Sequence, residues 1–547
     1  MIETSRKRLA SLYEVQVEVL SPLHIGSGGA PLMPNLDYYE AEDRVVVVDP
    51  NAVVAELEEE VLQRLSDEFN LSTLVRLLYE RGGADALARV ARYTLPLLPE
   101  AGEIVPQLKD AFGHPYLPGS SLKGAWRTAL AWALWTDDPV LGAKAARRYR
   151  VLAFREQIVA PVFRALDAGK PVDWHKLVRE TFNPNENETE EYVYAAKDVF
   201  AAAVDKLQKD KPFLSKRGQW NDGEVSKRLK VQDKFADDSI ERLLFGRDPN
   251  FDALRVVQVS DSNAVEATTL LLGRAAVYAK RPDGKMEEQS PIFLEYLPAG
   301  TKFTLTLKLD RFLAGVPAGM PRDDKPRNVA SHLRSRALTV ASEEAIVNAC
   351  RRFAAQVLDA EMRFFADVGG LAAVRGAYER LRSQMASLRE HECLVPLAWG
   401  TGWTSKTLGT LLKTDENTFH ALWAQYWGSR NRPQLIGDFP TSCKLLKLAD
   451  GSLAPLGWVK VTFLPTDAPI HLTTPARTAV AAIPLPSATP AGKAGAMGTL
   501  PEQEVAVVHP KKQAKPKPAQ PPKKKQDAGE KARRQQEEIM RRMREGN

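Results

Sequence analysis

The 547-residue sequence is informative first through what it lacks. It has only three cysteines, Cys350, Cys393 and Cys443, spaced 43 and 50 residues apart. This spacing excludes a disulfide framework and a short zinc-binding motif, so we expect buried free thiols. No run of about eighteen apolar residues occurs, so no membrane-spanning helix is expected. The first residues have no apolar stretch of the kind found in signal peptides, so we expect a cytoplasmic protein.

Histidine is also scarce, and the HxH, HExxH and paired-aspartate patterns of metal sites are missing. The sequence therefore predicts neither a metal nor another cofactor. Among the eight histidines, His24 stands out because it precedes a glycine-rich loop. As a general base it could activate an RNA 2′-hydroxyl, as in metal-independent ribonucleases. A lone histidine before such a loop is more often structural, and we expect no enzyme activity.

The positive charge of the chain is concentrated at its end. Residues 511–547 contain 13 Lys or Arg against 5 Asp or Glu, a balance of +8, whereas the whole chain carries +6. Residues 1–510 are therefore slightly acidic, and any RNA site there must be a local patch. From residue 467 onward the chain is rich in Pro, Ala and Lys without periodicity, which predicts a disordered basic tail.

Two kinds of pattern alternate along the rest of the chain. Alternating apolar residues, as in Tyr13–Leu20, predict strands, and long stretches with helical spacing predict separate helical blocks. This mixture indicates an α+β protein. The predicted units are an N-terminal domain at 1–310 with a helical insertion at about 138–240, a C-terminal domain at 311–466, and the tail at 467–547.

The segment Pro115–Leu130, PYLPGSSLKGAWRTAL, predicts a helix whose start is unusually basic. After its Pro-Gly pair, Ser120 or Ser121 can cap the first turn. Lys123 and Arg127 follow near the helix N-terminus, where cations are unfavourable unless an anion stands in front of them. Free N–H groups, hydroxyls and two cations suit a phosphate. A capped helix with two solvated basic residues would show the same pattern.

Two glycine loops complete the candidate site. SPLHIGSGGA follows the first predicted strand, and WGTGWTSKT occupies Trp399–Thr407. Glycine allows a phosphate backbone to come close, and an indole can stack on a base. The second loop nearly matches a nucleotide-binding P-loop, but Ser405 stands where that loop requires glycine. We therefore do not expect an NTPase.

Four segments match one protein family in the right order: SPLHIGSGG at Ser21, LPGSSLKGAWRTAL at Leu117, WGTGWTSKT at Trp399 and PLGWVKV at Pro455. The first two resemble the RAMP superfamily, the repeat-associated RNA-binding subunits of CRISPR effector complexes. The last two resemble the fifth subunits of the type III-A Csm complex. The match covers roughly residues 10–465 and leaves out the tail. The sequence departs from the pattern in having few basic residues after Thr441.

The resemblance implies two ferredoxin-like, RRM-like RAMP domains, each with a glycine-rich loop. It implies a non-catalytic subunit that binds crRNA, caps the filament at the crRNA 3′ end and supports crRNA maturation. Its partners would be crRNA, the repeated backbone subunit and the small helical subunit of the Csm complex, target RNA indirectly, and host nucleases that trim the crRNA. Two alternatives remain open: an endoribonuclease acting through His24, and a RAMP subunit at the crRNA 5′ end.

The residues expected to contact RNA come from the glycine loops and the helix start. They are His24, Gly26, Ser27, Gly28, Gly29, Ser120, Ser121, Lys123, Arg127, Trp399, Gly400, Gly402, Trp403 and Lys406. Contacts of this kind are made to the RNA backbone and to base faces, so we expect little sequence specificity.

Overall fold

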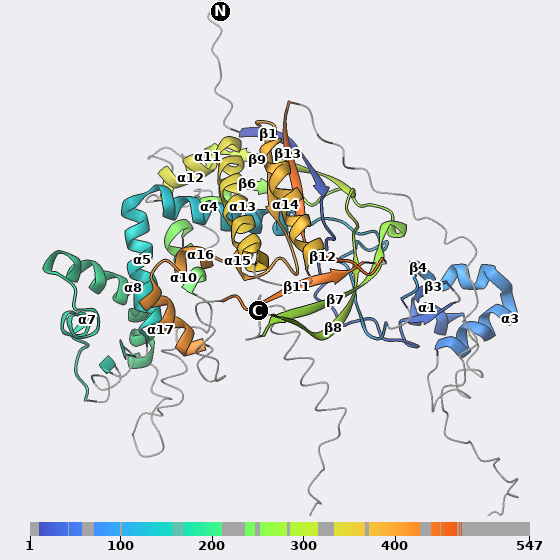
Figure 1. Cartoon of the computed structure of the whole chain (residues 1–547), viewed down its shortest axis with the longest axis horizontal. Coiled ribbons are helices and arrows are strands. Elements are labelled where there is room, and N and C mark those ends of the chain that lie inside the picture. Colours follow the sequence, from blue (N-terminus) through green and yellow to red (C-terminus); the bar gives the residue numbers. More distant parts are fainter. Residues whose placement is uncertain are drawn as a thin grey trace, which may run out of the picture.

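The predicted mixture of strands and helices is confirmed in the computed structural model, which contains two five-stranded sheets and one three-stranded sheet in the part of the chain it describes (Figure 1). The described residues are 10–41, 43–56, 71–98, 101–155, 157–158, 161–162, 165, 168–209, 236–246, 252–281, 285–314, 333–366, 371–426, 439–448, 450–467, 470 and 472. The predicted disordered tail lies almost entirely outside these residues.

The first sheet is built around the strand predicted at the N-terminus. Its order is β10 (Glu392–Pro396), β13 (Trp458–Thr466), β1 (Ala10–Val19), β9 (Lys302–Asp310) and β6 (Val257–Val259), and every pairing is antiparallel. In β1, Val15, Val17 and Val19 are buried. Because side chains alternate between the two faces of a strand, this pattern points one face of the sheet toward the core.

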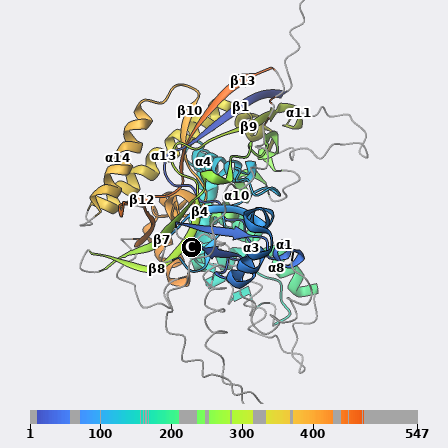
Figure 2. The same ribbon diagram turned by 90° about the vertical axis from the view of Figure 1, so that its right-hand side faces the viewer.

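Two long helices pack against one another beside this sheet. They are α4 (Gly119–Asp137) and α13 (Glu343–Ala366), and α14 (Ala372–Ala386) packs on α13 (Figure 2). The predicted helical stripe of α4 is confirmed, because Leu122, Trp126 and Leu130 are all buried. The Trp126 ring lies 5.5 Å from that of Phe463 on β13, which joins α4 to the sheet.

The second sheet contains two strands on either side of the Asp450–Gly451 turn. Its order is β12 (Leu453–Pro455), β11 (Ser442–Lys447), β7 (Leu271–Lys280), β8 (Met286–Tyr296) and β5 (Ile104–Val105). Each five-stranded sheet thus combines strands from both sides of residue 310. The sheets do not separate at that boundary, and the domain limits and the number of ferredoxin-like domains stay predictions.

A smaller unit lies to one side of the two large sheets (Figure 1). It consists of β2 (Tyr38–Glu40), β3 (Arg44–Val48), β4 (Ala91–Pro96), α1 (Pro50–Ala55) and α3 (Leu71–Val90). The valines of β3 are buried, and those on one face join a separate core with α3.

The predicted insertion is helical where the structure describes it, on the opposite side of the molecule from the small sheet (Figure 1). Its helices are α5 (Pro139–Ala153), α7 (Trp174–Phe182), α8 (Glu186–Lys209) and α10 (Ala236–Phe245). The remaining elements are η3 (Ala253–Val256), η4 (Ala267–Thr269), α11 (Arg311–Ala314), α12 (Arg334–Val340), α15 (Trp403–Lys406), α16 (Gly409–Leu412) and α17 (Glu416–Tyr426).

All three cysteines are free, as predicted, and Cys350 and Cys393 are fully buried, whereas Cys443 is half-buried. None of the helices in the described ranges has the length and apolar character needed to cross a bilayer.

Candidate RNA-binding surface

The two glycine loops, far apart in sequence, touch in the structure. The Trp399 N–H donates to the His24 carbonyl oxygen over 3.1 Å, and the two rings meet edge to face with centroids 5.8 Å apart. The PLGW segment joins them, since the Gly457 N–H donates to the Pro22 oxygen over 2.8 Å and the Gly457 oxygen accepts from Leu397 over 2.6 Å. Three of the four family segments therefore converge.

Strand register explains why these segments meet. Val19 at the end of β1 pairs with Val459 at the start of β13, and Pro396 at the end of β10 pairs with Trp458. The loops that leave these three neighbouring strands consequently start from one end of the first sheet. Glycine is required at 457, because its φ is +78° and a Cβ there would lie 2.2 Å from the Leu397 oxygen.

His24 is buried beneath this surface instead of being exposed on it. Its side chain is 1% exposed, and Nδ1 lies 2.6 Å from the Glu295 carbonyl oxygen. Because a carbonyl oxygen only accepts, Nδ1 carries the proton and donates it. Burial, aided by the charges of Lys109 and Lys406, lowers the pKa of His24 to about 4. The predicted RNA contact of His24 is therefore wrong: the neutral ring supports Trp399 from below.

A buried carboxylate holds the first glycine loop in place. Glu295 is fully buried and accepts hydrogen bonds from Tyr93 Oη over 2.6 Å, from the Gln107 N–H over 2.7 Å and from Lys109 Nζ. The Gln107 side chain in turn accepts from the Ile25 N–H over 2.8 Å. Sequence reasoning missed this network; its only signal was one acidic residue within the apolar run FLEY.

The tip of the first loop remains open to solvent. Gly26, Ser27, Gly28 and Gly29 are all exposed. Gly28 has a φ of +75°, which favours glycine, and the Ser27 N–H donates to the Pro106 oxygen over 3.3 Å. These four residues are accessible to an RNA backbone, and their RNA contacts stay predictions.

Two lysines lie at the joined glycine loops, one of them beside the half-buried Trp399. Lys444 Nζ lies 5.2 Å from the Trp399 ring centroid, and Lys406, at the end of α15, reaches solvent. Neither lysine has a carboxylate partner among the described residues. Desolvation and the charge of Lys444 lower the pKa of Lys406 to about 8, and desolvation also lowers the pKa of Lys444. Two cations without a counter-charge would be stabilised by an anion.

Lys444 is the functional candidate that sequence reasoning missed. It follows Thr441, in the stretch where the family resemblance led us to expect more basic residues. The expected basic residues pointed to this stretch of the chain. Nothing in the sequence showed, however, that β11 would bring this lysine to Trp399.

The other residues of the second loop have structural roles. Trp403 is only 8% exposed, and its ring centroid lies 4.8 Å from that of Phe439, so the prediction that it stacks on a base is wrong. Gly400 has a φ of +87°, and a Cβ there would lie 2.6 Å from the Leu456 side chain. Gly402 has a φ of +89° with more space around it. Both glycines are needed for the shape of the loop.

The start of α4 is already occupied by an anion from the chain itself. No side chain of the segment caps the helix, so the prediction that Ser120 or Ser121 does so is wrong. Instead, an Asp261 carboxylate oxygen accepts from the Gly119 N–H over 2.9 Å. A carboxylate complements the partial positive charge of a helix N-terminus as a phosphate would. Ser120 is exposed and Ser121 is half-buried, and their RNA contacts stay predictions.

The two cations of α4 make internal contacts. Lys123 Nζ donates to the Val257 oxygen over 2.7 Å. Arg127 pairs with Glu241 over 2.7 Å and with Asp252 over 2.8 Å. In this structure their donors tie α4 to β6, η3 and α10, and the phosphate contacts of both residues stay predictions.

The mixed α+β architecture and the joined glycine loops agree with the class of protein that the motifs suggested. A family model described as the RAMP superfamily matches residues 16–370, well over half of the chain. The chain belongs to the RAMP superfamily.

Individual relatives agree with this membership. The chain is similar to the CRISPR system Cms protein Csm5 of Methanocaldococcus jannaschii, with 23% identity over 254 residues, covering 44% of this chain and 55% of that protein. The chain thus matches about half the length of this curated relative.

The chain is also similar to two solved structures. A chain in the cryo-EM structure of the Csm–crRNA–target RNA ternary complex of a type III-A CRISPR–Cas system is 21% identical, with a TM-score of 0.49, covering 83% of this chain and 100% of that one. The crystal structure of T. onnurineus Csm5 is 21% identical, with a TM-score of 0.43, covering 81% and 99%.

Proposed function

We propose that this protein is a non-catalytic, crRNA-binding subunit of a type III-A CRISPR effector complex, that it caps the complex at the crRNA 3′ end and that it supports crRNA maturation. Membership of the RAMP superfamily and similarity to a protein named Csm5 support this proposal. The observation that carries the RNA contact is the pair of lysines at the joined glycine loops: Lys444 lies beside Trp399, and its charge acts on Lys406 of the second loop.

The chemistry of this surface suits single-stranded RNA. Cations contribute to the binding of a phosphate backbone, and an indole stacks on bases of any sequence. The exposed tip Gly26–Gly29 belongs to the loop that contacts Trp399 through His24, so a strand could follow both loops. Recognition of this kind is directed to backbone and shape, and it requires no metal ligand or nucleophile.

The ribonuclease alternative lacks a suitable base. A general base must reach the 2′-hydroxyl, directly or through one water. The His24 ring is buried, and its Nδ1 is engaged with the Glu295 carbonyl. We therefore propose no enzymatic activity for this residue.

Binding of crRNA tests the role of the two lysines. We expect the double variant Lys406→Ala/Lys444→Ala to reduce the slope of log affinity against log salt by about 1.4, since each lost contact to single strands removes about 0.7. The matched control is Lys302→Ala/Lys447→Ala, which removes the same charge from exposed positions. Equal slopes for the two double variants would contradict the proposed contact.

The position in the complex requires a second experiment. A photo-reactive nucleotide is placed at either the 3′ or the 5′ end of crRNA, and the complex is assembled from this chain and the other subunits. We expect crosslinks to this chain from the 3′ end. Crosslinks from the 5′ end alone would favour the alternative RAMP subunit, and failure to join the assembly would contradict membership of the complex.

A further inference from the structure

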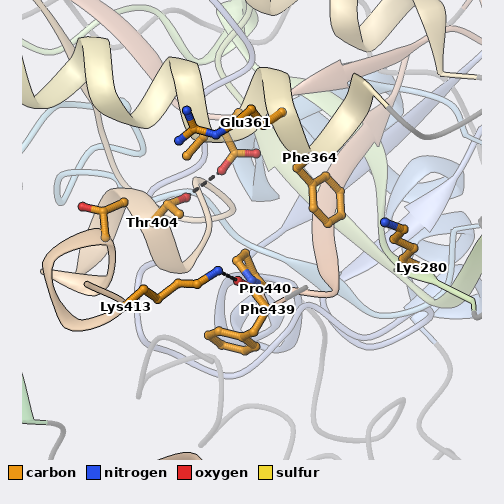
Figure 3. Close-up of a pocket in the computed structure, with 10 residues that line it drawn as sticks. Lys280, Glu361, Phe364, Thr404, Lys413, Phe439 and Pro440 are labelled. Carbon is orange, nitrogen blue, oxygen red and sulfur yellow. Dashed lines mark hydrogen bonds between the residues drawn. The ribbon is translucent and has the colours of Figure 1, made fainter. Parts of the chain in front are cut away.

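A pocket of about 330 Å³ lies beside α13, and the second glycine loop contributes to its lining (Figure 3). Glu361 and Phe364 of α13, Thr404 of α15 and Lys280 at the end of β7 contribute to its lining, together with Phe439. Its size falls in the range of roughly 300–1,000 Å³ typical of small-molecule sites. None of these side chains belongs to the surface proposed above for RNA.

The polar groups of the pocket have unused hydrogen-bonding capacity. Glu361 is 8% exposed, accepts hydrogen bonds from Thr404 Oγ1 over 2.7 Å and from Tyr378, and has no ion-pair partner within the described ranges. Thr410 also lines the pocket, and its buried hydroxyl has no hydrogen-bond partner among the residues that the structure describes. Unsatisfied buried polar groups are costly, so a ligand that pairs with them gains affinity.

Aromatic side chains provide the apolar part of the lining. Phe364 is half-buried and lies edge to face with Phe365, 5.0 Å between centroids. Phe439 is held by the Trp403 and Trp423 rings, each with its centroid 4.8 Å away. Rings that are held in place by packing offer a planar ligand a surface at low entropic cost.

Cations add a positive charge to the same pocket. Lys280 and Arg363 both line it, Arg363 is exposed, and neither has a carboxylate partner in the described part of the chain. A third cation, Lys413, also lines the pocket and donates to the Phe439 oxygen over 2.6 Å. A ligand with an anionic group would therefore be attracted.

We propose that this pocket binds one nucleotide, with its base against Phe364 and hydrogen-bonded to Glu361 and Thr410, and its phosphate near Lys280. The required ligand is planar, has donors and acceptors on one edge and carries a phosphate. A free mononucleotide and the terminal nucleotide of an RNA strand share this chemistry. The inference does not rest on the proposed crRNA-binding function, because the isolated full-length chain should bind a mononucleotide.

Calorimetry of the full-length chain tests the inference with AMP, GMP, CMP and UMP. We expect saturable binding of at least one of them, and binding weaker by on the order of tenfold for ribose 5-phosphate, which lacks the base. Absence of binding by all four up to about 1 mM would overturn the proposal. Equal binding of inorganic phosphate would overturn it too, because a general anion site would explain that result.

Variants connect the binding to the pocket. Phe364→Ala should weaken binding on the order of tenfold through lost stacking. Thr410→Val, which nearly preserves shape, should also weaken it, and it keeps the test decisive if Phe364→Ala does not fold. The control Glu379→Gln, at an exposed position on α14, should bind normally. Unchanged binding by a folded Phe364 or Thr410 variant would refute the site.

Two further experiments distinguish a free nucleotide from an RNA terminus as the ligand, and the pocket from the RNA-binding surface as its site. A short RNA with a free 3′ end should displace the mononucleotide if a strand terminus is the ligand, and should not if a free nucleotide is the ligand. Lys406→Ala/Lys444→Ala should retain nucleotide binding even where crRNA binding is lost. Loss of nucleotide binding in that double variant would place the nucleotide at the RNA surface and overturn the pocket assignment.

Discussion

Replacing Glu361 by Gln should stabilise the protein above pH 7 and leave its stability nearly unchanged near pH 4. Burial raises the pKa of this carboxyl from its ordinary 4.5 to about 7, although hydrogen bonds from Thr404 and Tyr378 act in the opposite direction. The folded protein therefore keeps the proton over a pH range in which the unfolded chain has lost it. Glutamine has a similar shape and is neutral at every pH.

The sign and size of the effect follow from this difference in pKa. Below about pH 4.5 the carboxyl is neutral in both states, so its ionisation contributes nothing. Between about pH 4.5 and 7 the folded state binds more protons, and the free energy of unfolding of the wild type falls as pH rises. The total loss is about 3 kcal/mol, at 1.36 kcal/mol per pKa unit. Glu361→Gln should avoid this loss and gain that amount by pH 8.

Urea unfolding of both proteins between pH 4 and pH 8 measures the difference. We expect the midpoint of the Gln variant to exceed that of the wild type increasingly as pH rises, and to level off above pH 7. Glu379→Gln, which changes an exposed carboxyl of α14, is the matched control and should show no such trend. A difference that is constant with pH, or that shrinks as pH rises, would refute a buried carboxyl that prefers its neutral form.

Three other predictions follow from the contacts at the loops and at α4. Asp261→Ala should lower the free energy of unfolding by about 1 kcal/mol, the usual value of a helix N-cap, whereas Ser120→Ala should leave it unchanged. Equal melting temperatures for the two variants would contradict the Asp261 cap. His24→Ala should cost roughly 2–4 kcal/mol through the lost bond to Glu295 and the cavity beneath Trp399. Neither that variant nor the wild type should cleave crRNA precursor, and His24-dependent cleavage would restore the ribonuclease alternative. Affinity for crRNA should fall as pH rises through about 8, where Lys406 loses its proton. Lys406→Arg keeps its charge at this pH, so the variant should not show this fall in affinity. An identical pH profile in the Arg variant would exclude Lys406 from the contact.

Much of the fold follows from patterns within short stretches of sequence. The alternating valines of β1, the apolar run of β3 and the stripe of α4 all correspond to elements of the structure. Such elements depend on side-chain periodicity and on which face is buried, and both can be read over about ten residues. The glycine loops were located by the same local reasoning, because a positive φ or a close backbone approach favours glycine wherever it occurs.

The roles of the charged and aromatic side chains depended on partners that are distant in sequence. The sequence around Lys123 and Arg127 is the same whether they are solvated or hold a phosphate. Their internal partners, Glu241, Asp252 and the Val257 carbonyl, were visible only in the structure. The two tryptophans of the second loop illustrate the same limit. Trp403 packs against Phe439, whereas Trp399 remains half-buried with Lys444 nearby.

The physical reason is that the two kinds of information have different ranges. Backbone preference and amphipathic patterning are properties of neighbouring residues, so β1 and α4 can be located from the local sequence alone. The charge, hydration and accessibility of a side chain depend on every group packed around it. Strand order in the two large sheets brought Glu295 to His24 and Lys444 to Trp399, and so decided that the histidine is buried and that the lysine lies beside the indole.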